Sequence, residues 1–136
     1  MIKQKLLYVL FLLFFLMFLT NSQTQKAPKI FCEEPVYDFG TISHNNTIKH
    51  TFVIQNTGDD VLKILNIRVS CGCTIIKIKK KSIKPGKTTD LRIEVDLRGT
   101  EGKQSKEITI ESNDPDSKYY RLYVRGFTTN KNSQVF

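Results

Sequence analysis

Apolar and polar residues alternate with a period of two through most of the chain after residue 29, a pattern typical of half-buried β-strands. The clearest run covers 91–97, where four apolar residues alternate with Arg92, Glu94 and Asp96. Turn-favouring residues separate the runs. The pattern predicts strands over 48–55, 62–70, 74–78, 91–97, 107–112 and 119–125, after a broken first strand over 29–33 and 36–39. The predicted turns cover 56–60, 82–87, 99–102 and 113–116.

Two irregularities add detail to this pattern. Pro35 interrupts the first strand and has no N–H to donate to a ladder, so we expect this segment at a sheet edge. Within 62–70 the apolar phase changes after Ile64, which predicts a bulge or a switch between sheets.

The number and spacing of the strands predict an all-β fold, an immunoglobulin-like β-sandwich of about seven strands. We expect the domain to cover 30–127 and to be followed by a polar, flexible tail over 128–136. The sequence has no Trp, and no cysteine pair joins strands 48–55 and 107–112. The likeness to immunoglobulins is therefore expected in architecture only.

The N-terminus has the plan of a secretory signal. Lys3 and Lys5 precede an uncharged run over 6–19, and a polar stretch follows. A helix of that length rises ~21 Å, short of the ~30 Å hydrocarbon core. We predict an N-terminal signal helix within a signal peptide over 1–23, cleaved near Ser22 or Gln23, and a linker over 24–29. The protein is then exported to the periplasm or cell envelope; the alternative is an uncleaved anchor in the inner membrane.

Charge and motif content narrow the function classes. The formal net charge is +8, and loss of Lys3 and Lys5 with the signal leaves 8 − 2 = +6. An exported basic protein is expected to meet anionic envelope polymers or lipid head groups rather than nucleic acid. No serine-hydrolase elbow, phosphate loop, zinc-protease motif or nucleotide fingerprint occurs. We therefore expect a monomeric, non-enzymatic protein without a cofactor.

Seven short motifs follow one another in a distinctive order. In this order they resemble a bacterial family, domain of unknown function 1573, over residues 30–127. The resemblance implies an exported protein with one immunoglobulin-like sandwich, distantly similar to the Hydin-type, major-sperm-protein and PapD-type modules of scaffolding, adhesion and chaperone proteins. It implies no activity. The motifs are Tyr37–Ile42, His50–Phe52, Asn56–Gly58, Ser70–Thr74, Ile83–Lys87, Gly99–Gly102 and Ser112–Asp114.

Cys71 and Cys73 form the motif whose side chains are most reactive, and three interpretations of the motif remain open. In the first, the two thiols are structural, small apolar groups at the end of strand 62–70, with one of them bridged to Cys32. They can cycle between dithiol and disulfide, and so small a ring would be strained and easily reduced. They can also bind a metal with Cys32 or a histidine, although zinc sites usually show C-x₂₋₄-C spacing.

Six lysines within eleven residues form a strong positive segment. One interpretation is a binding strip for anionic envelope polymers. The other is an edge protected by lysine against strand-to-strand aggregation. The lysine strip consists of Lys77, Lys79, Lys80, Lys81, Lys84 and Lys87.

The last predicted strand places two tyrosines and two arginines on one face, a composition found at interfaces. If this strand has a free edge, it can accept a peptide strand; ordinary cross-strand packing is the alternative. His44 is expected in a loop and His50 half-buried on a strand. This aromatic–arginine stripe consists of Tyr119, Arg121, Tyr123 and Arg125.

The leading hypothesis is an exported, non-enzymatic module of the bacterial envelope that binds a protein or an anionic polymer. The alternative is a thiol-based redox or metal-handling protein that uses Cys71 and Cys73.

Overall fold

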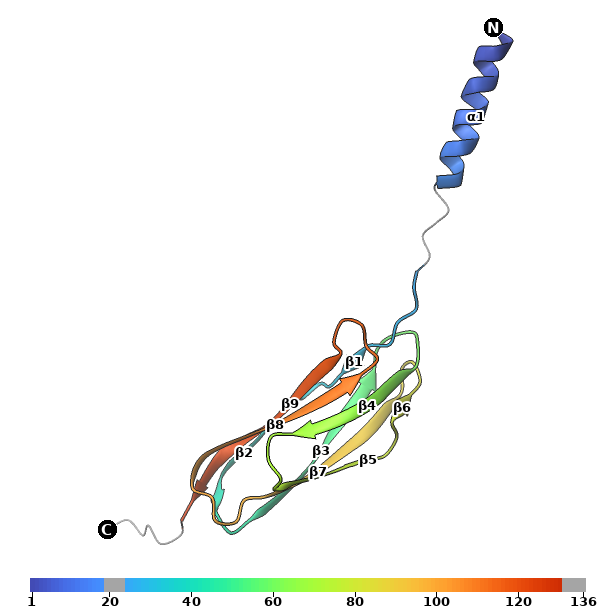
Figure 1. The fold of residues 1–136 in the computed structure, drawn as a ribbon. Helices are drawn as coiled ribbons and strands as arrows, with labels where there is room; N and C mark the ends of the chain where they lie inside the picture. Colours follow the sequence, from blue (N-terminus) through green and yellow to red (C-terminus); the bar gives the residue numbers. More distant parts are fainter. Residues whose placement is uncertain (19–23, 131–136) are drawn as a thin grey trace.

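The predicted strands assemble into two packed sheets in the computed structural model, which describes residues 1–18 and 24–130 (Figure 1). The described residues form nine strands rather than about seven, because the broken first strand makes two and Ser82–Ile83 pairs within the predicted turn. The helix is α1 (Ile2–Phe18). The strands are β1 (Ile30–Phe31), β2 (Val36–Ser43), β3 (Thr47–Asn56), β4 (Leu62–Val69), β5 (Thr74–Ile78), β6 (Ser82–Ile83), β7 (Thr88–Asp96), β8 (Gly102–Ser112) and β9 (Tyr119–Thr129).

One sheet has four strands in the order β1-β3-β7-β5, and the other has five in the order β2-β9-β8-β4-β6. All pairs are antiparallel except β2 with β9. The chain changes sheets between β1 and β2, and the carbonyl of Pro35 accepts a hydrogen bond from Tyr123 N–H there (2.8 Å). The expected edge position of this segment is confirmed for both halves, one in each sheet.

The phase change within the fourth strand is also confirmed as a bulge. The register of β4 against β8 shifts between Ile64 and Asn66. Leu65, at the shift, is exposed, whereas Ile64 and Leu62 before it are buried. The extra residue lets the apolar phase move while β4 stays in one sheet.

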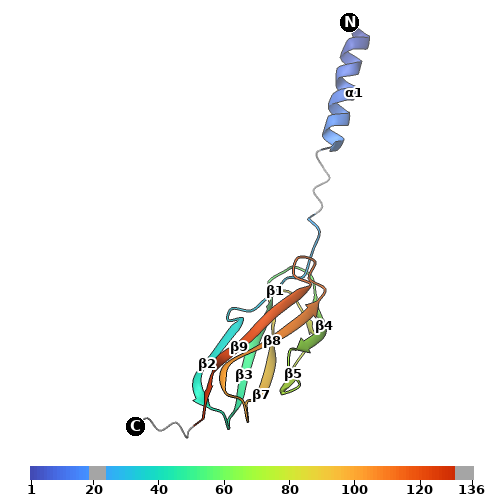
Figure 2. The same ribbon diagram turned by 60° about the vertical axis from the view of Figure 1, so that its left-hand side comes forward.

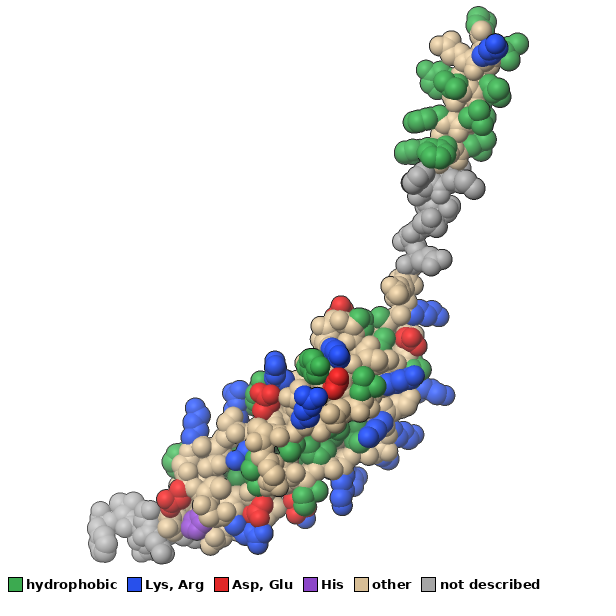
Figure 3. Space-filling model, in the orientation of Figure 1, with side chains coloured by type: hydrophobic (Ala, Val, Ile, Leu, Met, Phe, Trp, Pro, Cys, Tyr) green, Lys and Arg blue, Asp and Glu red, His purple; other side chains and the backbone are tan. Residues whose placement is uncertain are grey.

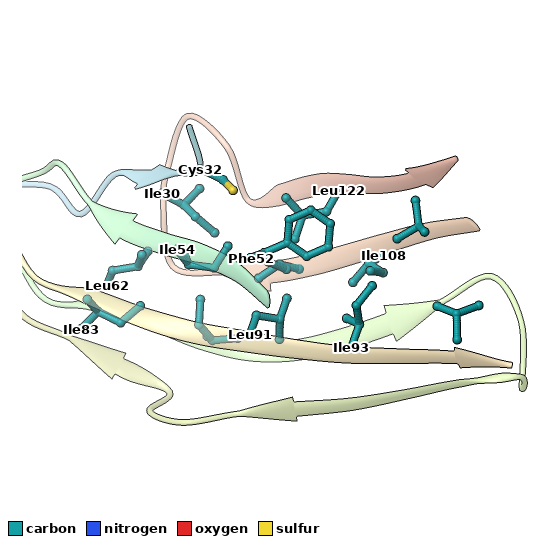
Figure 4. Packing of buried hydrophobic residues seen from close by; sticks show 14 of the residues in the cluster. Ile30, Cys32, Phe52, Ile54, Leu62, Ile83, Leu91, Ile93, Ile108 and Leu122 are labelled. Atoms are coloured by element: carbon teal, nitrogen blue, oxygen red, sulfur yellow. The ribbon is translucent and has the colours of Figure 1, made fainter. Parts of the chain in front are cut away.

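The core lies between the two sheets and is built from the alternating positions that the sequence predicted (Figure 4). Every buried apolar side chain of this cluster falls within residues 30–124, so the sandwich contains its whole core without α1. Burial of these side chains is the main stabilising term of the fold. They are Ile30, Cys32, Phe52, Ile54, Leu62, Ile64, Ile83, Leu91, Ile93, Val95, Leu97, Ile108, Ile110, Leu122 and Val124.

The C-terminal boundary lies further along the chain than predicted. Strand β9 runs to Thr129, so the tail does not begin at 128. Thr128 is buried, and its hydroxyl accepts a bond from Gln104 Nε2 (3.4 Å) and donates to the carbonyl of Gly102 (3.3 Å). Thr128, which the sequence assigned to the tail, is thus anchored by β8, whose pairing begins at Gly102. Thr129 lies opposite Ser43 of β2. Residues 131–136 of the predicted tail lie outside the described residues.

The N-terminal helix stands apart from the sandwich in both ribbon views (Figures 1 and 2). It covers Ile2–Phe18. None of the helical segments in the described chain has the length and apolarity that a membrane crossing requires. The cleavage site expected near Ser22 or Gln23 lies outside the described residues.

Asn56 ties together the elements at the end of the sandwich where the linker enters. This side chain is fully buried and forms four hydrogen bonds. Nδ2 donates to the carbonyls of Asp60 (2.7 Å) and Ile83 (2.9 Å). Oδ1 accepts the N–H groups of Lys29 (3.2 Å) and Gly58 (3.0 Å). One amide therefore joins the linker, the 57–60 turn and β6.

The 84–87 turn is fixed at the same end. Gly86 has a φ of 72°, as the third residue of a type II Pro-Gly turn requires. Its N–H donates to the Asn56 carbonyl (2.8 Å), and the carbonyl of Lys87 accepts the Asn56 N–H (3.0 Å). The predicted turn is confirmed, and it holds two lysines of the strip close to the linker.

Candidate functional site

The lysine strip lies along one side of the sandwich, on β5, on the connection to β6 and on the turn before β7. All six side chains are exposed. Figure 3 shows Lys and Arg side chains gathered along the side formed by β5 and β6. The fold thus keeps the segment together on one surface rather than dispersing it.

No residue of the strip takes part in an ion pair within residues 1–18 and 24–130. The ion pairs there join other residues, such as Lys49 with Glu94 (3.6 Å) and Arg121 with Glu107 (3.4 Å). The backbone of the strip is held by bonds such as Lys79 N–H to the Asp90 carbonyl (3.1 Å). The chain therefore fixes the positions of the lysines without neutralising their charge.

Sequence reasoning missed Arg92, which extends this positive surface. Arg92 on β7 lies directly opposite Lys77 on β5, and both side chains are exposed. Like charges directly opposite on neighbouring strands destabilise a sheet. Asp90 and Glu94 flank Arg92 on β7, but no ion pair joins either of them to Arg92 in the described chain. The alternation of the sequence could have placed Arg92 on the outer face, since it is a polar residue between the buried Leu91 and Ile93.

Lys77 and Arg92 border a shallow hollow of about 560 Å³ on the outer face of the four-stranded sheet. The hollow is partly apolar, because Ile75 is 58% exposed there. It is lined by Lys49, His50, Thr51, Ile75, Lys77, Arg92, Ile93 and Glu94.

Strand β5 is an edge strand. It pairs with β7 on one side, and no strand of the described chain lies along its other side. Lys77 points outward from it, and Lys79 to Lys81 continue beyond its end. The geometry thus fits both interpretations of the strip, edge protection and ligand binding.

The cysteines occupy two separate places. Cys71 and Cys73 are joined by a disulfide in the crossover from β4 to β5, whereas Cys32 is a buried free thiol. The structure therefore differs from the expectation that Cys32 bridges to one of the pair. Burial is the main cause that raises the pKa of Cys32. No three His, Cys, Asp or Glu side chains gather as metal ligands in the part of the chain described.

The aromatic–arginine stripe does not lie at an edge, so the edge-strand interface is wrong, and of the two interpretations ordinary cross-strand packing remains. Strand β9 pairs with β2 on one side and with β8 on the other. Tyr123, for example, lies between Val36 and Glu107. The interior position arises because the chain after Pro35 crosses to this sheet and covers β9. The stripe instead crosses the outer face of the five-stranded sheet, where Arg125 lies 5.1 Å from the Tyr123 ring centroid.

Both histidines lie where they were predicted. His44 is in the turn after β2, and its Nδ1 is 3.3 Å from the Thr129 carbonyl oxygen. His50 is half-buried on β3, stacked on Tyr37 at 3.8 Å and edge-on to Phe52 at 4.7 Å between ring centroids. Burial lowers the pKa of His50.

A sequence profile for proteins of unknown function, DUF1573, matches residues 30–128. The chain belongs to the DUF1573 family. The resemblance carried by the sequence motifs is thereby confirmed. No curated protein matches this DUF1573 chain in sequence.

Solved structures share the sandwich. A protein of unknown function from Porphyromonas gingivalis W83 aligns with a TM-score of 0.67 at 24% identity, over 79% of this chain and 51% of that one. PapD-like domain 7 of human CEP192 aligns at 0.55 and 11% identity, over 83% and 94% of the two chains. The VesB protease of Vibrio cholerae aligns at 0.62 and 12% identity, over 84% and 35%.

These likenesses concern the fold alone, since every identity is below 25%. The DUF1573 chain spans about half the length of the Porphyromonas protein and about a third of VesB. An immunoglobulin-like, PapD-like sandwich is thus the architecture of this domain.

Proposed function

We propose that this DUF1573 protein is an exported, non-enzymatic module of the bacterial cell envelope that binds an anionic polymer. The lysine strip and Arg92 form the binding surface. The observation that carries the proposal is the exposed Lys77–Arg92 pair, two like charges directly opposite each other without an ion-pair partner in the described residues. An anionic ligand between them would relieve the repulsion that the sheet otherwise bears.

Charge and shape support the same ligand class. A row of lysines along an edge and a turn matches the repeating charges of an extended polyanion better than one small anion. The hollow beside Lys77 adds the exposed side chain of Ile75, on which an apolar sugar face can pack. The basic and apolar N-terminal segment supports export, because it has the order of a secretory signal.

Binding of residues 24–136 to dextran sulfate tests the proposal, with neutral dextran as the control polymer. The shortened chain retains the whole core, which lies within residues 30–124. We expect dextran sulfate to bind and the affinity to fall as salt rises from about 0.1 M to about 1 M, because the Debye length shortens from ~10 Å to ~3 Å.

Lys77→Glu is expected to weaken polymer binding without destabilising the fold. The change places a carboxylate opposite Arg92, which favours the sheet while it reverses a charge of the binding surface. Combined with Lys79→Glu, it should weaken dextran sulfate binding at least about tenfold, since each lysine near an anionic surface contributes ~1 kcal/mol. The matched control reverses two lysines of β8 that form no ion pair in the described residues, Lys103→Glu and Lys106→Glu. Equal affinity of the two double variants, or no binding of the native chain at about 0.1 M salt, would refute the proposal.

A further inference from the structure

The Cys71–Cys73 disulfide lies in an accessible part of the chain. The crossover from β4 to β5 leaves both cysteines partly exposed and Gly72 between them exposed. A Cβ added at Gly72 would meet no atom within 4 Å outside its two chain neighbours, so open space borders the residue between the cysteines. An external thiol can therefore reach this part of the crossover, as exchange requires.

The disulfide is not what holds this crossover in place. Ser70 N–H donates to the Glu107 carbonyl (3.0 Å), and Glu107 N–H donates to Ser70 Oγ (3.0 Å). At the other end, Asp96 N–H donates to the Cys73 carbonyl (3.0 Å). A bond between residues only two positions apart also constrains the unfolded chain far less than one that closes a long loop. The sandwich is therefore expected to survive reduction of the bond.

The two sulfur atoms are not equivalent. Cys73 N–H lies 3.2 Å from Cys71 Sγ and donates a hydrogen bond to it. A donor at this position stabilises the thiolate of Cys71 once the bond opens. Cys71 is thus the better leaving group, which directs the attack to Cys73 Sγ. Cys73 is partly exposed and also packs against the core.

We propose that Cys71 and Cys73 form a thiol–disulfide exchange site that accepts two electrons from an external dithiol. A thiolate of the dithiol attacks Cys73 Sγ, and the electron pair of the broken S–S bond passes to Cys71 Sγ. The second thiolate of the dithiol then attacks the first sulfur atom of the dithiol, which is bound to Cys73 in the mixed disulfide. This attack releases Cys73 as a thiolate. The dithiol is oxidised to a disulfide, the pair is reduced to two thiols, and the two protons lost by the dithiol balance those gained by the cysteines.

The third cysteine does not compete in this reaction. Cys32 is only 4% exposed, and its Sγ donates to the Glu34 carbonyl (3.5 Å). Its burial disfavours the thiolate, the form that exchanges.

Exchange and polymer binding also use different residues. The double variant Cys71→Ser with Cys73→Ser should therefore lose exchange and still bind dextran sulfate.

The first test titrates residues 24–136 with dithiothreitol. Acid quenching, alkylation and mass spectrometry report the fraction of bridged pair, while far-ultraviolet circular dichroism reports the fold. We expect one bond to be lost while the strand signal is unchanged, and Cys32 to stay unlabelled when iodoacetamide is added to the folded protein without acid. Three free thiols in the air-oxidised protein, or a bond that opens only as the strand signal disappears, would overturn the proposal.

The second test compares single thiols. Cys73→Ala leaves Cys71 with its backbone donor, whereas Cys71→Ala leaves Cys73 without that sulfur–N–H contact. The donor increases the thiolate fraction of Cys71 more than it lowers the nucleophilicity of that thiolate. Iodoacetamide should therefore label Cys71 about threefold faster than Cys73 at neutral pH. Cys71→Ser and Cys73→Ser repeat the comparison if an alanine variant fails to fold. Identical rates and identical pH midpoints for the two thiols would overturn the assignment of Cys71 as the leaving group.

Discussion

Replacing Asn56 with alanine tests whether one buried amide holds the linker end of the sandwich together. The substitution removes four hydrogen bonds of 2.7–3.2 Å at a side chain with no exposed surface. It leaves the carbonyls of Asp60 and Ile83 and the N–H groups of Lys29 and Gly58 without this partner. Alanine can replace none of them.

The expected magnitude follows from that count. A buried hydrogen bond contributes about 1 kcal/mol net, so four of them set an upper range of about 4 kcal/mol. Three of the four groups, at Lys29, Gly58 and Asp60, are only partly buried and can recover some solvation. We therefore expect Asn56→Ala to lower the free energy of unfolding by about 3 kcal/mol, a large share of the ~5–15 kcal/mol of a typical domain.

Urea denaturation of residues 24–136 measures this loss, followed by far-ultraviolet circular dichroism because the chain has no Trp. Asn113→Ala is the matched control. Its amide also bridges two segments, with Nδ2 donating to the Val61 carbonyl (3.0 Å) and Oδ1 accepting Lys63 N–H (2.7 Å), but it is exposed. Water can replace those bonds, so the control should lose about 1 kcal/mol or less. Equal losses for the two variants would refute the reasoning.

Two further predictions concern packing and pH. Gly58→Ala places a Cβ against the backbone of 27–29, within 2.6 Å of the nitrogen of residue 29, and should cost about 1–3 kcal/mol in urea denaturation. Gly72→Ala, whose Cβ meets nothing within 4 Å, should change stability little. Burial holds the pKa of His50 below its unfolded value of ~6.5, so the unfolded chain binds the proton first as pH falls. The free energy of unfolding should therefore decrease below about pH 7, and His50→Gln should make this dependence on pH less steep. An unchanged slope in the variant contradicts the assignment of the slope to His50.

Local sequence patterns were sufficient to predict most of the fold. The alternation over 91–97 predicted a strand with one face in the core, and those four apolar residues are 0–3% exposed. Pro35 predicted an edge because a missing N–H is a property of the residue itself. The bulge in β4 followed from the change of phase at Ile64. Each of these predictions needs only neighbours along the sequence.

Features that depend on which strands are neighbours could not be predicted from the sequence. The 56–60 turn was predicted, but the role of Asn56 was not, because its partners extend from Lys29 to Ile83. An edge position was one of two interpretations of the aromatic–arginine stripe, since nothing near it in the sequence indicates that β2 pairs with β9. The opposition of Lys77 and Arg92 likewise depends on the β5–β7 register.

The two interpretations of the lysine strip differ in whether the sign of the charge matters. An edge strand is protected from pairing by any charged side chain, because burying either sign against another strand costs desolvation. A polyanion is attracted by one sign alone. Lys77→Glu with Lys79→Glu therefore keeps β5 protected while it opposes the ligand, so edge protection predicts an unchanged monomer and unchanged dextran sulfate affinity. Loss of affinity in a variant that light scattering shows to be monomeric would favour ligand binding over edge protection.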